Sequence, residues 1–353
     1  MIETDKVFSF EEGLIEYLGF KGPETFFFDI ETTGLSPRNS EIYLIGVVYQ
    51  KDGQWRFHQW FSEALRDEET LLRSFFSFIE TFKTVIHFNG DTFDIKFIES
   101  TAKSYHIPCG LSEKRSVDLL KIARKIKKVL PLDSLRQKEI EKFLGIYRED
   151  PFTGGELIEV YEAYRDTHDK GLLKPLLLHN EEDLIGMPKL LPILLYYKLL
   201  KESGDFTVKN HYLNKSGTRL TIECETEKCF PGKAVGHTEC GCLLSIEGLG
   251  FIVEIPLLQE TLKSYLPHPE DYYYLPKEDM VVHKALASSV DPKYRVKATK
   301  EQCFVSFTGA FVPARKALNF TVFRKDLSDK KGYFPLNKID LEGYVRAVFA
   351  DLS

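Results

Sequence analysis

Residues 26–35 read Phe-Phe-Phe-Asp29-Ile-Glu31-Thr-Thr-Gly-Leu, an apolar run that ends in two carboxylates. Side chains alternate between the two faces of a β-strand, so Asp29 and Glu31 are predicted to project from the same face. The three phenylalanines indicate a central strand that is buried on both faces. An unpaired negative charge in that environment would cost several kcal/mol, and a bound cation would remove the cost.

A second acidic segment, residues 85–94, reads Val-Ile-His-Phe-Asn-Gly-Asp-Thr-Phe-Asp. It predicts a short buried strand that passes through a Gly-containing turn into a helix over 92–106, with Thr92 or Asp91 as the N-cap. Asp94 is then expected in the first helical turn, beside the end of the strand.

A third segment, residues 176–185, places His179 and Asp183 on an apolar helical pattern. Residues at this spacing lie on one face of a helix with their Cβ atoms about 5–6 Å apart. The imidazole and the carboxylate are therefore expected to converge. Pro188 and Pro192 are expected to kink or segment the helix after Asp183.

Together the three segments supply the groups that a two-metal phosphodiester hydrolysis requires. That reaction needs a deprotonated water and stabilised charge on the attacking and leaving oxygens, and two divalent ions about 3.5–4 Å apart supply both. Carboxylate ligands favour Mg²⁺ or Mn²⁺ over zinc. We assign Asp29, Glu31 and Asp183 to the first ion, Asp94 to the second or to both, and His179 as general base. Each segment alone also fits a strand end, a helix cap or a solvated helix face, so the assignment depends on their conjunction.

The same segments resemble the motifs of the DEDD superfamily of 3′ to 5′ exonucleases, which have a ribonuclease H-like fold. The matching positions are Asp29-Ile-Glu31 in motif one, Asn89-x-x-x-Phe93-Asp94 in motif two and His179-x-x-x-Asp183 in motif three. A closer similarity is to the uncharacterised bacterial YprB-type ribonuclease H-like proteins, which share the His-Asn-x-x-Asp form of motif three and a stretch similar to residues 144–156. The resemblance covers about residues 22–200 and implies exonuclease activity with two metal ions.

Three positions in or near these motifs leave alternatives open. The superfamily usually has Tyr-x-x-x-Asp or His-x-x-x-x-Asp in motif three, so His179 could orient the attacking water instead of deprotonating it. Related nucleases often have an Asp-Leu at the position of Asp118, but this residue could equally cap a helix from Leu119. Asp118 and the similarly ambiguous Asp91 are left outside the catalytic set.

Substrate contacts are expected from polar residues of the motifs and from one basic segment. The net charge of −6 means that nucleic acid must be attracted by local positive charge. Residues 114–142 contain ten Lys or Arg and four Asp or Glu, and a single helical stripe of Lys121, Arg124, Lys125 and Lys128 could follow a phosphate backbone. A solvated helix face is the alternative. The residues assigned to substrate binding are Asn89, Thr32, Lys121, Arg124 and Lys125.

The order of apolar and helical patterns predicts an α/β fold with a ribonuclease H-like mixed sheet, in which three antiparallel strands are followed by parallel strands and flanked by helices. Strands are expected at 41–50 and 54–61, joined by an Asp52-Gly53 hairpin turn, and at 84–88 and 115–118. Helices are expected near 67–83, 92–106, 119–145, 155–168 and 173–200. Residues 1–200 are therefore expected to form the exonuclease domain.

Composition changes at a polar connector that begins at Lys201. Residues 201–353 are expected to form a smaller antiparallel β-rich (α+β) accessory domain that guides the substrate. Its expected elements are strands at 206–213, 217–224, 242–247, 250–256, 301–312 and 319–323 and a helix at 277–289.

The overall composition is that of a globular protein, with 43% hydrophobic and 28% charged residues among 353. No apolar stretch reaches the roughly 20 residues of a membrane span, and the N-terminus lacks a secretory pattern, so a cytoplasmic protein with reduced thiols is expected. A structural zinc site remains open at Cys224, Cys229, His237, Cys240 and Cys242, whose spacing differs from the usual zinc knuckles.

The sequence therefore favours a metal-dependent 3′ to 5′ exonuclease that hydrolyses single-stranded DNA or RNA. Two other functions fit the same fold. One is a catalytically silent nucleic-acid-binding or assembly module, and the other is an endonuclease of the ribonuclease H type. The choice between DNA and RNA and the oligomeric state are left open, because discrimination of the 2′-hydroxyl depends on side-chain positions that spacing does not fix.

Overall fold

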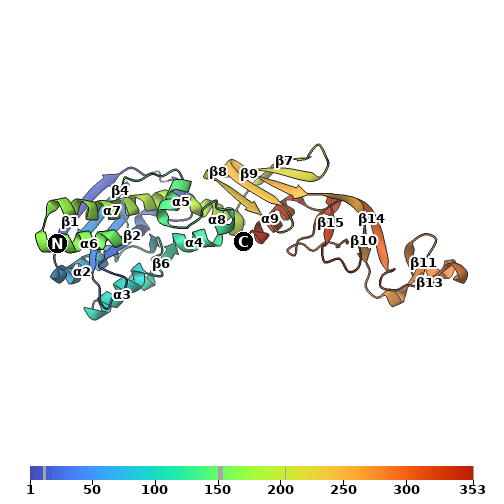
Figure 1. Cartoon of the computed structure of the whole chain (residues 1–353), viewed down its shortest axis with the longest axis horizontal. Helices are drawn as coiled ribbons and strands as arrows, with labels where there is room; N and C mark the ends of the chain where they lie inside the picture. The colour runs from blue at the N-terminus through green and yellow to red at the C-terminus, as the bar shows by residue number, and fades with distance from the viewer. Residues whose placement is uncertain (11–12, 150–153, 203, 353) are drawn as a thin grey trace. The chain divides into compact units, whose positions relative to one another are not determined.

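A computed structural model describes residues 1–10, 13–149, 154–202 and 204–352 (Figure 1). The chain divides into two compact units. Unit 1 consists of Met1–Lys127, Pro131–Leu199 and Phe230–Gly232, and unit 2 of Lys128–Leu130, Leu200–Cys229 and Lys233–Ser353.

Unit 1 is built on a six-stranded mixed sheet with strand order β1-β4-β3-β2-β5-β6. The strands are β1 (Ile2–Phe8), β2 (Thr25–Thr32), β3 (Ile42–Lys51), β4 (Gln54–Phe61), β5 (Thr84–His87) and β6 (Arg115–Asp118). The pairs among β1 to β4 are antiparallel, and β5 and β6 join in parallel. The expected α/β fold class is confirmed. The edge strand β1 was not expected from the sequence.

The two faces of the sheet carry different helices (Figure 1). Phe26, Phe28 and Ile30 pack in one apolar core with residues of α2 (Glu68–Ile79) and α3 (Asp94–Ser104). On the other face, α6 (Gly154–Thr167) and α7 (Lys170–Lys189) cover the sheet through a second core. Because side chains alternate along β2, Asp29 and Glu31 lie on the α7 face.

Several local predictions in unit 1 are confirmed. Asp52 and Gly53 have φ angles of 52° and 73°, the left-handed pair that the tight turn between β3 and β4 requires. The helix expected over 173–200 is segmented as predicted, since α7 ends at Lys189 and α8 spans Ile193–Lys201. Asp118 caps α4 by accepting hydrogen bonds from the N–H groups of Leu120 and Lys121.

Two helix predictions in unit 1 are wrong. The helix expected over 119–145 is divided into α4 (Leu119–Lys125), a 3₁₀ turn (Lys127–Val129) and α5 (Gln137–Phe143). Pro131 accounts for the break, because the residue before a proline is disfavoured in the helical conformation. The expected cap of α3 is also wrong, since its N-cap is Phe93 and no side chain caps it.

The described residues of unit 2 form three small sheets and a C-terminal helix. Their elements are β7 (Thr207–Leu213), β8 (Arg219–His237), β9 (Leu243–Pro256), β10 (Leu258–Tyr265), β11 (Tyr272–Leu275), β12 (Met280–His283), β13 (Val296–Lys297), β14 (Phe304–Pro313), β15 (Tyr333–Pro335) and α9 (Leu341–Asp351). The sheet orders are β7-β8-β9, β10-β14-β15 and β12-β11-β13. The rings of Phe206, Phe251 and Phe349 pack edge to face in its interior.

Three predictions in unit 2 are wrong. Residues 243–256 form one strand, β9, where a turn was expected to divide two. The helix expected at 277–289 is replaced by β12 and a 3₁₀ turn, because Val281 and Val282 pair with the tyrosines of β11. Of the expected strand at 319–323, Phe323 forms an isolated bridge to Tyr333.

Among the helices that the structure describes, none combines the length and the apolar character that crossing a bilayer requires.

Candidate metal centre

The three acidic motifs meet where β2 changes partners. β2 pairs antiparallel with β3 along its length, but its parallel pairing with β5 ends at Phe27 and Ile86. Beyond that point the backbone N–H of Ile30 bonds to the carboxylate of Asp94, at the start of α3. Asp94 therefore lies beside Asp29, at the carboxyl end of the parallel strands, where α/β sheets commonly bind ligands.

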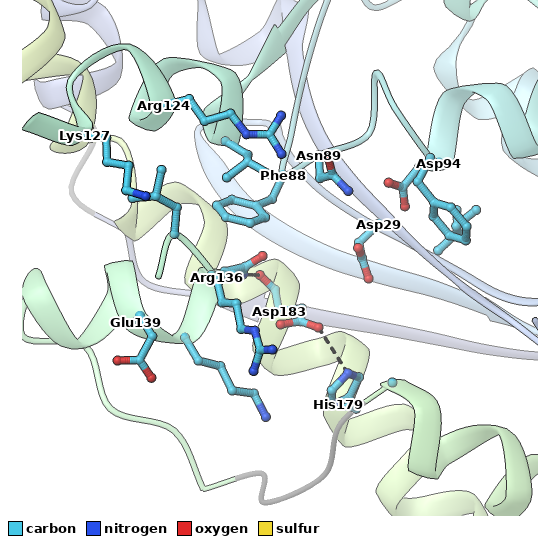
Figure 2. Close-up of a pocket in the computed structure, with 17 residues that line it drawn as sticks. Asp29, Phe88, Asn89, Asp94, Arg124, Lys127, Arg136, Glu139, His179 and Asp183 are labelled. Atoms are coloured by element: carbon cyan, nitrogen blue, oxygen red, sulfur yellow. Dashed lines mark hydrogen bonds and ion pairs between the residues drawn. The ribbon is translucent and has the colours of Figure 1, made fainter. Parts of the chain in front are cut away.

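A pocket of about 930 Å³ opens at this point. Figure 2 shows Asp29, Asp94, Asp183 and His179 around the same space as three basic side chains. The described residues that line it are Asp29, Ile30, Phe88, Asn89, Phe93, Asp94, Leu120, Arg124, Lys127, Leu135, Arg136, Gln137, Lys138, Glu139, Gly154, His179 and Asp183. Acidic, basic and aromatic groups thus share one cavity within unit 1.

Motif three brings an imidazole between two carboxylates. His179 Nε2 lies 3.4 Å from Asp183 Oδ2 and 3.8 Å from Glu31 Oε1. One potential ligand atom from each of these residues lies within 4.8 Å of the others. The expected convergence of His179 and Asp183 is present, and Glu31 joins them. We call Asp29, Glu31, Asp94, His179 and Asp183 the motif cluster.

Negative charge accumulates in the motif cluster. Burial raises the pKa of Asp29 well above its usual value, and the nearby charges of Asp94, Glu31 and Asp183 raise it further. Burial also raises the pKa of Asp94 to about 7, although backbone N–H groups from Asp94 itself and Ile30 oppose the shift. The carboxylates are thus held in an arrangement that disfavours their charged forms in the absence of a cation.

A polar chain that the sequence did not reveal holds Asp29 in place. Asn180 Nδ2 donates to Asp29 Oδ2 at 2.8 Å, and Asn180 Oδ1 accepts from Gln59 Nε2 at 2.9 Å. Asp29, Gly46 and Gln59 are cross-strand partners on β2, β3 and β4, so they lie in one row under α7. Asn180 is thereby fixed above the row and orients one carboxylate oxygen of Asp29.

Gly46 makes this close approach of helix and sheet possible. A Cβ atom at this position would lie 2.1 Å from Asn180 Oδ1 and 2.2 Å from Leu184 Cδ1. Any other residue type would have to displace the side chains of Asn180 and Leu184. The signal in the sequence was a glycine within the apolar run of β3, and its meaning depends on strand register.

Arg148 is the second residue that sequence analysis did not assign. Its guanidinium forms an ion pair with Asp183 Oδ1 and a bidentate pair with Glu141. The side chains of Arg148 and Glu141 are only 8% and 1% exposed. Gln137 Nε2 also donates to the backbone carbonyl of Asp183 at 2.9 Å. Asp183 therefore has one oxygen held by Arg148, while Oδ2 faces His179.

A second group of potential ligands in unit 1 has a different character. We call His87, Asp91 and Asp118 the turn cluster, and its ligand atoms also lie within 4.8 Å of one another. The N–H of Gly90 donates to His87 Nδ1 at 3.0 Å, so the neutral ring carries its proton on Nε2, which faces Ser116 Oγ at 2.8 Å. Neither ring nitrogen then offers a lone pair to a metal.

The acidic members of the turn cluster are neutralised locally. Asp91 accepts from Lys121 Nζ and Ser116 Oγ, each at 2.6 Å. Burial raises the pKa of Asp91, but these hydrogen bonds outweigh it and lower the pKa below the usual value. Asp118 accepts from three backbone N–H groups, including that of Asn89 at 3.1 Å. The network engages Asp118 through Oδ1 alone, and its Oδ2 is buried without a hydrogen-bond partner among the described residues.

The residues assigned to substrate binding divide into two groups. Asn89 and Arg124 line the pocket, and Asn89 has the left-handed φ of 66° that this residue type tolerates. The other three are engaged elsewhere: Thr32 Oγ1 donates to the Gly34 carbonyl at 2.8 Å, Lys121 pairs with Asp91, and Lys125 Nζ lies 5.2 Å from the centre of the Tyr197 ring.

The expected basic stripe is interrupted. Lys128 does not continue it, because α4 ends at Lys125. The pocket instead receives Lys127, Arg136 and Lys138 in addition to Arg124. Of the expected stripe, Arg124 lines the pocket. The other positive charges that this segment brings to the pocket come from Lys127, Arg136 and Lys138.

The cysteine-rich segment does not gather a metal site in the described parts of the chain. There, the groups of three or more closely spaced His, Cys, Asp or Glu are Glu31, His179 and Asp183 of the motif cluster and the three residues of the turn cluster. The five residues left open for zinc belong to neither group; they are Cys224, Cys229, His237, Cys240 and Cys242.

The donor set of the motif cluster suits hard divalent cations. It offers carboxylate oxygens from Asp29, Glu31, Asp94 and Asp183 and one imidazole, and it contains no thiol. Such ligands match magnesium or manganese better than zinc. The raised pKa values of Asp29 and Asp94 have the sign expected for a site whose charge a cation completes.

Comparisons with known proteins agree with this geometry. Residues 26–195 match a family model described as the RNase_H superfamily. The chain is 30% identical to the uncharacterized protein YprB of Bacillus subtilis (strain 168) over 200 residues, a match that covers 55% of this chain and 48% of YprB. The chain thus spans about half the length of this curated relative.

Solved structures give weaker similarities. The family B DNA polymerase of the archaeon Pyrobaculum calidifontis is 15% identical, with a TM-score of 0.41 and coverage of 76% of this chain and 40% of that chain. Exonuclease I of E. coli, solved with a 5cy-dT13 oligonucleotide, is 11% identical, with a TM-score of 0.29 and coverage of 56% and 54%. Since both scores are low, the fold is assigned from the sheet order and the family match.

Proposed function

From the match of residues 26–195 to the RNase_H superfamily model and from the geometry of the pocket, we propose that this chain is a metal-dependent nuclease. Its reaction would be 3′ to 5′ exonucleolytic hydrolysis of phosphodiester bonds in single-stranded DNA or RNA. The supporting observation is one pocket that combines Asp29, Asp94 and Asp183 with Arg124 and Arg136. A module that only bound nucleic acid would gain nothing from buried carboxylates, because they repel phosphate.

The proposed cofactor is a pair of Mg²⁺ or Mn²⁺ ions, held by Asp29, Glu31, Asp94 and Asp183. Ions bound there would supply an activated water and stabilise the charge on the attacking and leaving oxygens. The chain contributes the alignment of the ligands. Asn180 holds Oδ2 of Asp29 at 2.8 Å, and Arg148 pairs with Oδ1 of Asp183 and leaves Oδ2 toward the cluster.

His179 has two candidate roles in the proposed reaction. As a general base it would accept the proton of the attacking water, and as a positioning group it would hydrogen-bond that water. In the structure its Nε2 faces Asp183 Oδ2 at 3.4 Å, a contact that orients the ring toward the acidic side of the pocket. If His179 is the general base, the cleavage rate should fall at acidic pH, and His179→Gln should remove this pH dependence. If His179 only positions the water, His179→Gln should lower the rate and leave the pH dependence unchanged.

The basic and aromatic lining of the pocket suits a single strand. Arg124, Lys127 and Arg136 would contact phosphates, and Phe88 offers a ring on which an unpaired base can stack. Asn89 would position the strand or the loop that carries it. Stacking and backbone contacts tolerate many sequences, so the proposed activity has little sequence preference.

We also propose that residues 1–200 act as the exonuclease domain and 201–353 as an accessory domain that guides the strand, in a protein of the cytoplasm. Support for the second role comes from aromatic and basic side chains on the β12-β11-β13 sheet and its neighbouring turn. Arg295 lies 4.9 Å from the centre of the Tyr273 ring, and Lys293 lies 4.8 Å from the centre of the Tyr294 ring. Such pairs are suited to bases and phosphates.

The test uses 5′-labelled single-stranded DNA and RNA, each with a free or a blocked 3′ end, incubated with the full chain and Mn²⁺ or Mg²⁺. The proposal predicts stepwise shortening from free 3′ ends and no shortening of blocked substrates. Internal fragments from blocked substrates would identify an endonuclease. Binding without cleavage under all metal conditions would identify a silent binding module.

Asp29→Asn and Asp91→Asn form a matched pair for this assay. Both replace a carboxylate by an amide of the same shape, but Asp91 belongs to the turn cluster and pairs with Lys121. Cleavage that is lost in Asp29→Asn and retained in Asp91→Asn supports the proposed site. Equal activity in both variants contradicts it.

A further inference from the structure

Two cysteines in unit 2 lie together in a tight turn, apart from the proposed nuclease site. Cys240 is exposed and Cys242 is fully buried, and Gly241 between them has a φ of 85°. The Thr238 N–H bonds to the Cys242 carbonyl, and the Cys242 N–H bonds to Thr238 Oγ1, each at 3.0 Å. This turn brings the two thiols into a direct side-chain hydrogen bond.

A buried guanidinium contacts the pair. Arg315 is only 4% exposed, and its Nη2 lies 2.7 Å from Cys242 Sγ. Its Nη1 forms an ion pair with Asp351, and its Nε lies 3.4 Å from the hydroxyl of Tyr344. The guanidinium is therefore enclosed by one carboxylate, one phenol and one sulfur.

This environment favours a negative charge on the sulfurs. A buried guanidinium needs strong acceptors, and a neutral thiol is a weak one. The carboxylate of Asp351 is 43% exposed, so it compensates Arg315 only from one side. A thiolate shared by Cys240 and Cys242 would give Arg315 Nη2 a charged acceptor on its other side, and Thr238 Oγ1, 3.1 Å from Cys240 Sγ, can donate to that thiolate.

Exposure distinguishes the two members of the pair, because a small oxidant can reach Cys240, whereas Cys242 is fully buried. The hydrogen bond from Cys242 lowers the pKa of Cys240 to about 5, and Thr238 and the charge of Arg315 act in the same direction. The same hydrogen bond and burial raise the pKa of Cys242. An accessible thiol of lowered pKa thus lies beside a buried thiol of raised pKa, and the exposed member is the one placed to react first with an oxidant.

We propose that Cys240 and Cys242 form a redox-active dithiol that reduces hydrogen peroxide to water and closes to an intramolecular disulfide. The Cys240 thiolate attacks one peroxide oxygen, the O–O bond breaks, and hydroxide leaves, so that Cys240 becomes a sulfenic acid. The Cys242 thiol gives up its proton and attacks the Cys240 sulfur, and the S–O bond breaks to release water. In sum, two thiols and one peroxide give one disulfide and two waters, with two electrons passing from sulfur to oxygen.

The experiment treats the reduced full chain with hydrogen peroxide at neutral pH, quenches with an alkylating agent and maps the tryptic peptides. Residues 234–263 form a peptide that contains Cys240 and Cys242 and no other cysteine, and the exposed Cys229 falls in the peptide 229–233. The peptide 234–263 is expected to lose two hydrogens, to resist alkylation and to recover after reduction. Its oxidation is expected about tenfold faster than that of Cys229, because the larger thiolate fraction is partly offset by lower nucleophilicity.

Variants separate the two roles. Cys242→Ala is expected to accumulate a sulfenic acid at Cys240 that dimedone traps, and Cys240→Ser, at an exposed position, is expected to abolish peroxide consumption by this peptide. Arg315→Gln, with its fold checked by circular dichroism, is expected to slow the oxidation of Cys240 several-fold. Equal oxidation rates at Cys240 and Cys229, or over-oxidation of Cys240 in the intact chain without loss of two hydrogens, would overturn the proposal.

Discussion

The motif cluster and the turn cluster combine a histidine with acidic residues in the same domain, but they differ in how their charge is balanced. In the turn cluster, Lys121 and Ser116 lower the pKa of Asp91, and the N–H of Gly90 fixes the tautomer of His87. In the motif cluster, burial and mutual repulsion raise the pKa of Asp29 and Asp94. In both clusters the potential ligands lie close together. The motif cluster differs because its carboxylates lack enough nearby positive charge, and this deficit suits it to a cation.

The largest expected effect concerns catalysis. Asp183→Asn is expected to lower metal-dependent cleavage by about 10²–10³-fold, since it removes a charge that holds the ions in place. Asp91→Asn should stay within a few-fold of the unchanged chain. Initial rates at saturating Mn²⁺ measure both.

Thermal unfolding supplies an independent reading of the same comparison. Mn²⁺ is expected to raise the melting temperature of the unchanged chain and of Asp91→Asn, because an ion that binds only the folded state stabilises it. The increase should disappear in Asp183→Asn. Equal increases in all three proteins would remove the distinction between the clusters.

Gly46→Ala tests the support under the motif cluster. The added Cβ would meet Asn180 and Leu184, and overpacking of this kind costs about 1–3 kcal/mol. Cleavage should fall as well, because Asn180 orients Asp29. Gly110→Ala is the matched control, since nothing lies within 4 Å of its Cβ position. Urea unfolding midpoints and cleavage rates should change for Gly46→Ala and remain unchanged for Gly110→Ala.

The dependence of stability on pH should have opposite signs in the two clusters. The folded pKa of Asp94 is raised from 3.8 to about 7, so its contribution to stability is present at acidic pH and is lost as pH rises toward 7. In metal-free buffer at pH 8, Asp94→Asn should therefore be more stable than the unchanged chain, by a few kcal/mol at most. Near pH 4 that advantage should vanish.

Asp91→Asn should behave in the opposite way. The folded pKa of Asp91 lies below its usual value, so its contribution is present at neutral pH and is lost as pH falls through the folded pKa. The variant should be less stable than the unchanged chain at pH 8 and equal to it in acid. Denaturant unfolding with EDTA across this range measures both variants, and a shared sign would contradict the contrast.

The smallest expected effect concerns the basic lining. Arg124→Ala is expected to weaken oligonucleotide binding a few-fold and to reduce its salt dependence by about one phosphate contact. Lys121→Ala, which removes a side chain engaged by Asp91, should change binding less. Fluorescence anisotropy at several salt concentrations distinguishes them, and equal losses would indicate a diffuse electrostatic surface.

The sequence predicted those parts of the molecule that depend on local periodicity. Alternation along a strand placed Asp29 and Glu31 on one face, and helical spacing brought His179 to Asp183. The Asp52-Gly53 turn and the mixed sheet followed from the same kind of local signal. The resemblance in motif order was confirmed by the family match over 26–195 and by the similarity to YprB.

What the sequence did not predict depends on contacts between distant segments. The role of Asn180 needs the register that aligns Asp29, Gly46 and Gln59, and no spacing within one segment contains it. Arg148 reaches Asp183 from a separate stretch of chain. The basic stripe was wrong beyond Lys125 because the expected helix ends there, so residues that looked aligned in sequence do not share a face.

The contacts of Gln137 link the proposed ion site to the pocket wall proposed to bind nucleic acid. Gln137 contacts the backbone carbonyl of Asp183 and the carboxylate of Glu141, and its neighbour Arg136 lines the pocket. One short helix thus reaches both the ligand-bearing backbone and the strand-binding wall. Binding of nucleic acid at this wall should therefore change the affinity for cations, and by thermodynamic reciprocity cations should change the affinity for nucleic acid by the same factor.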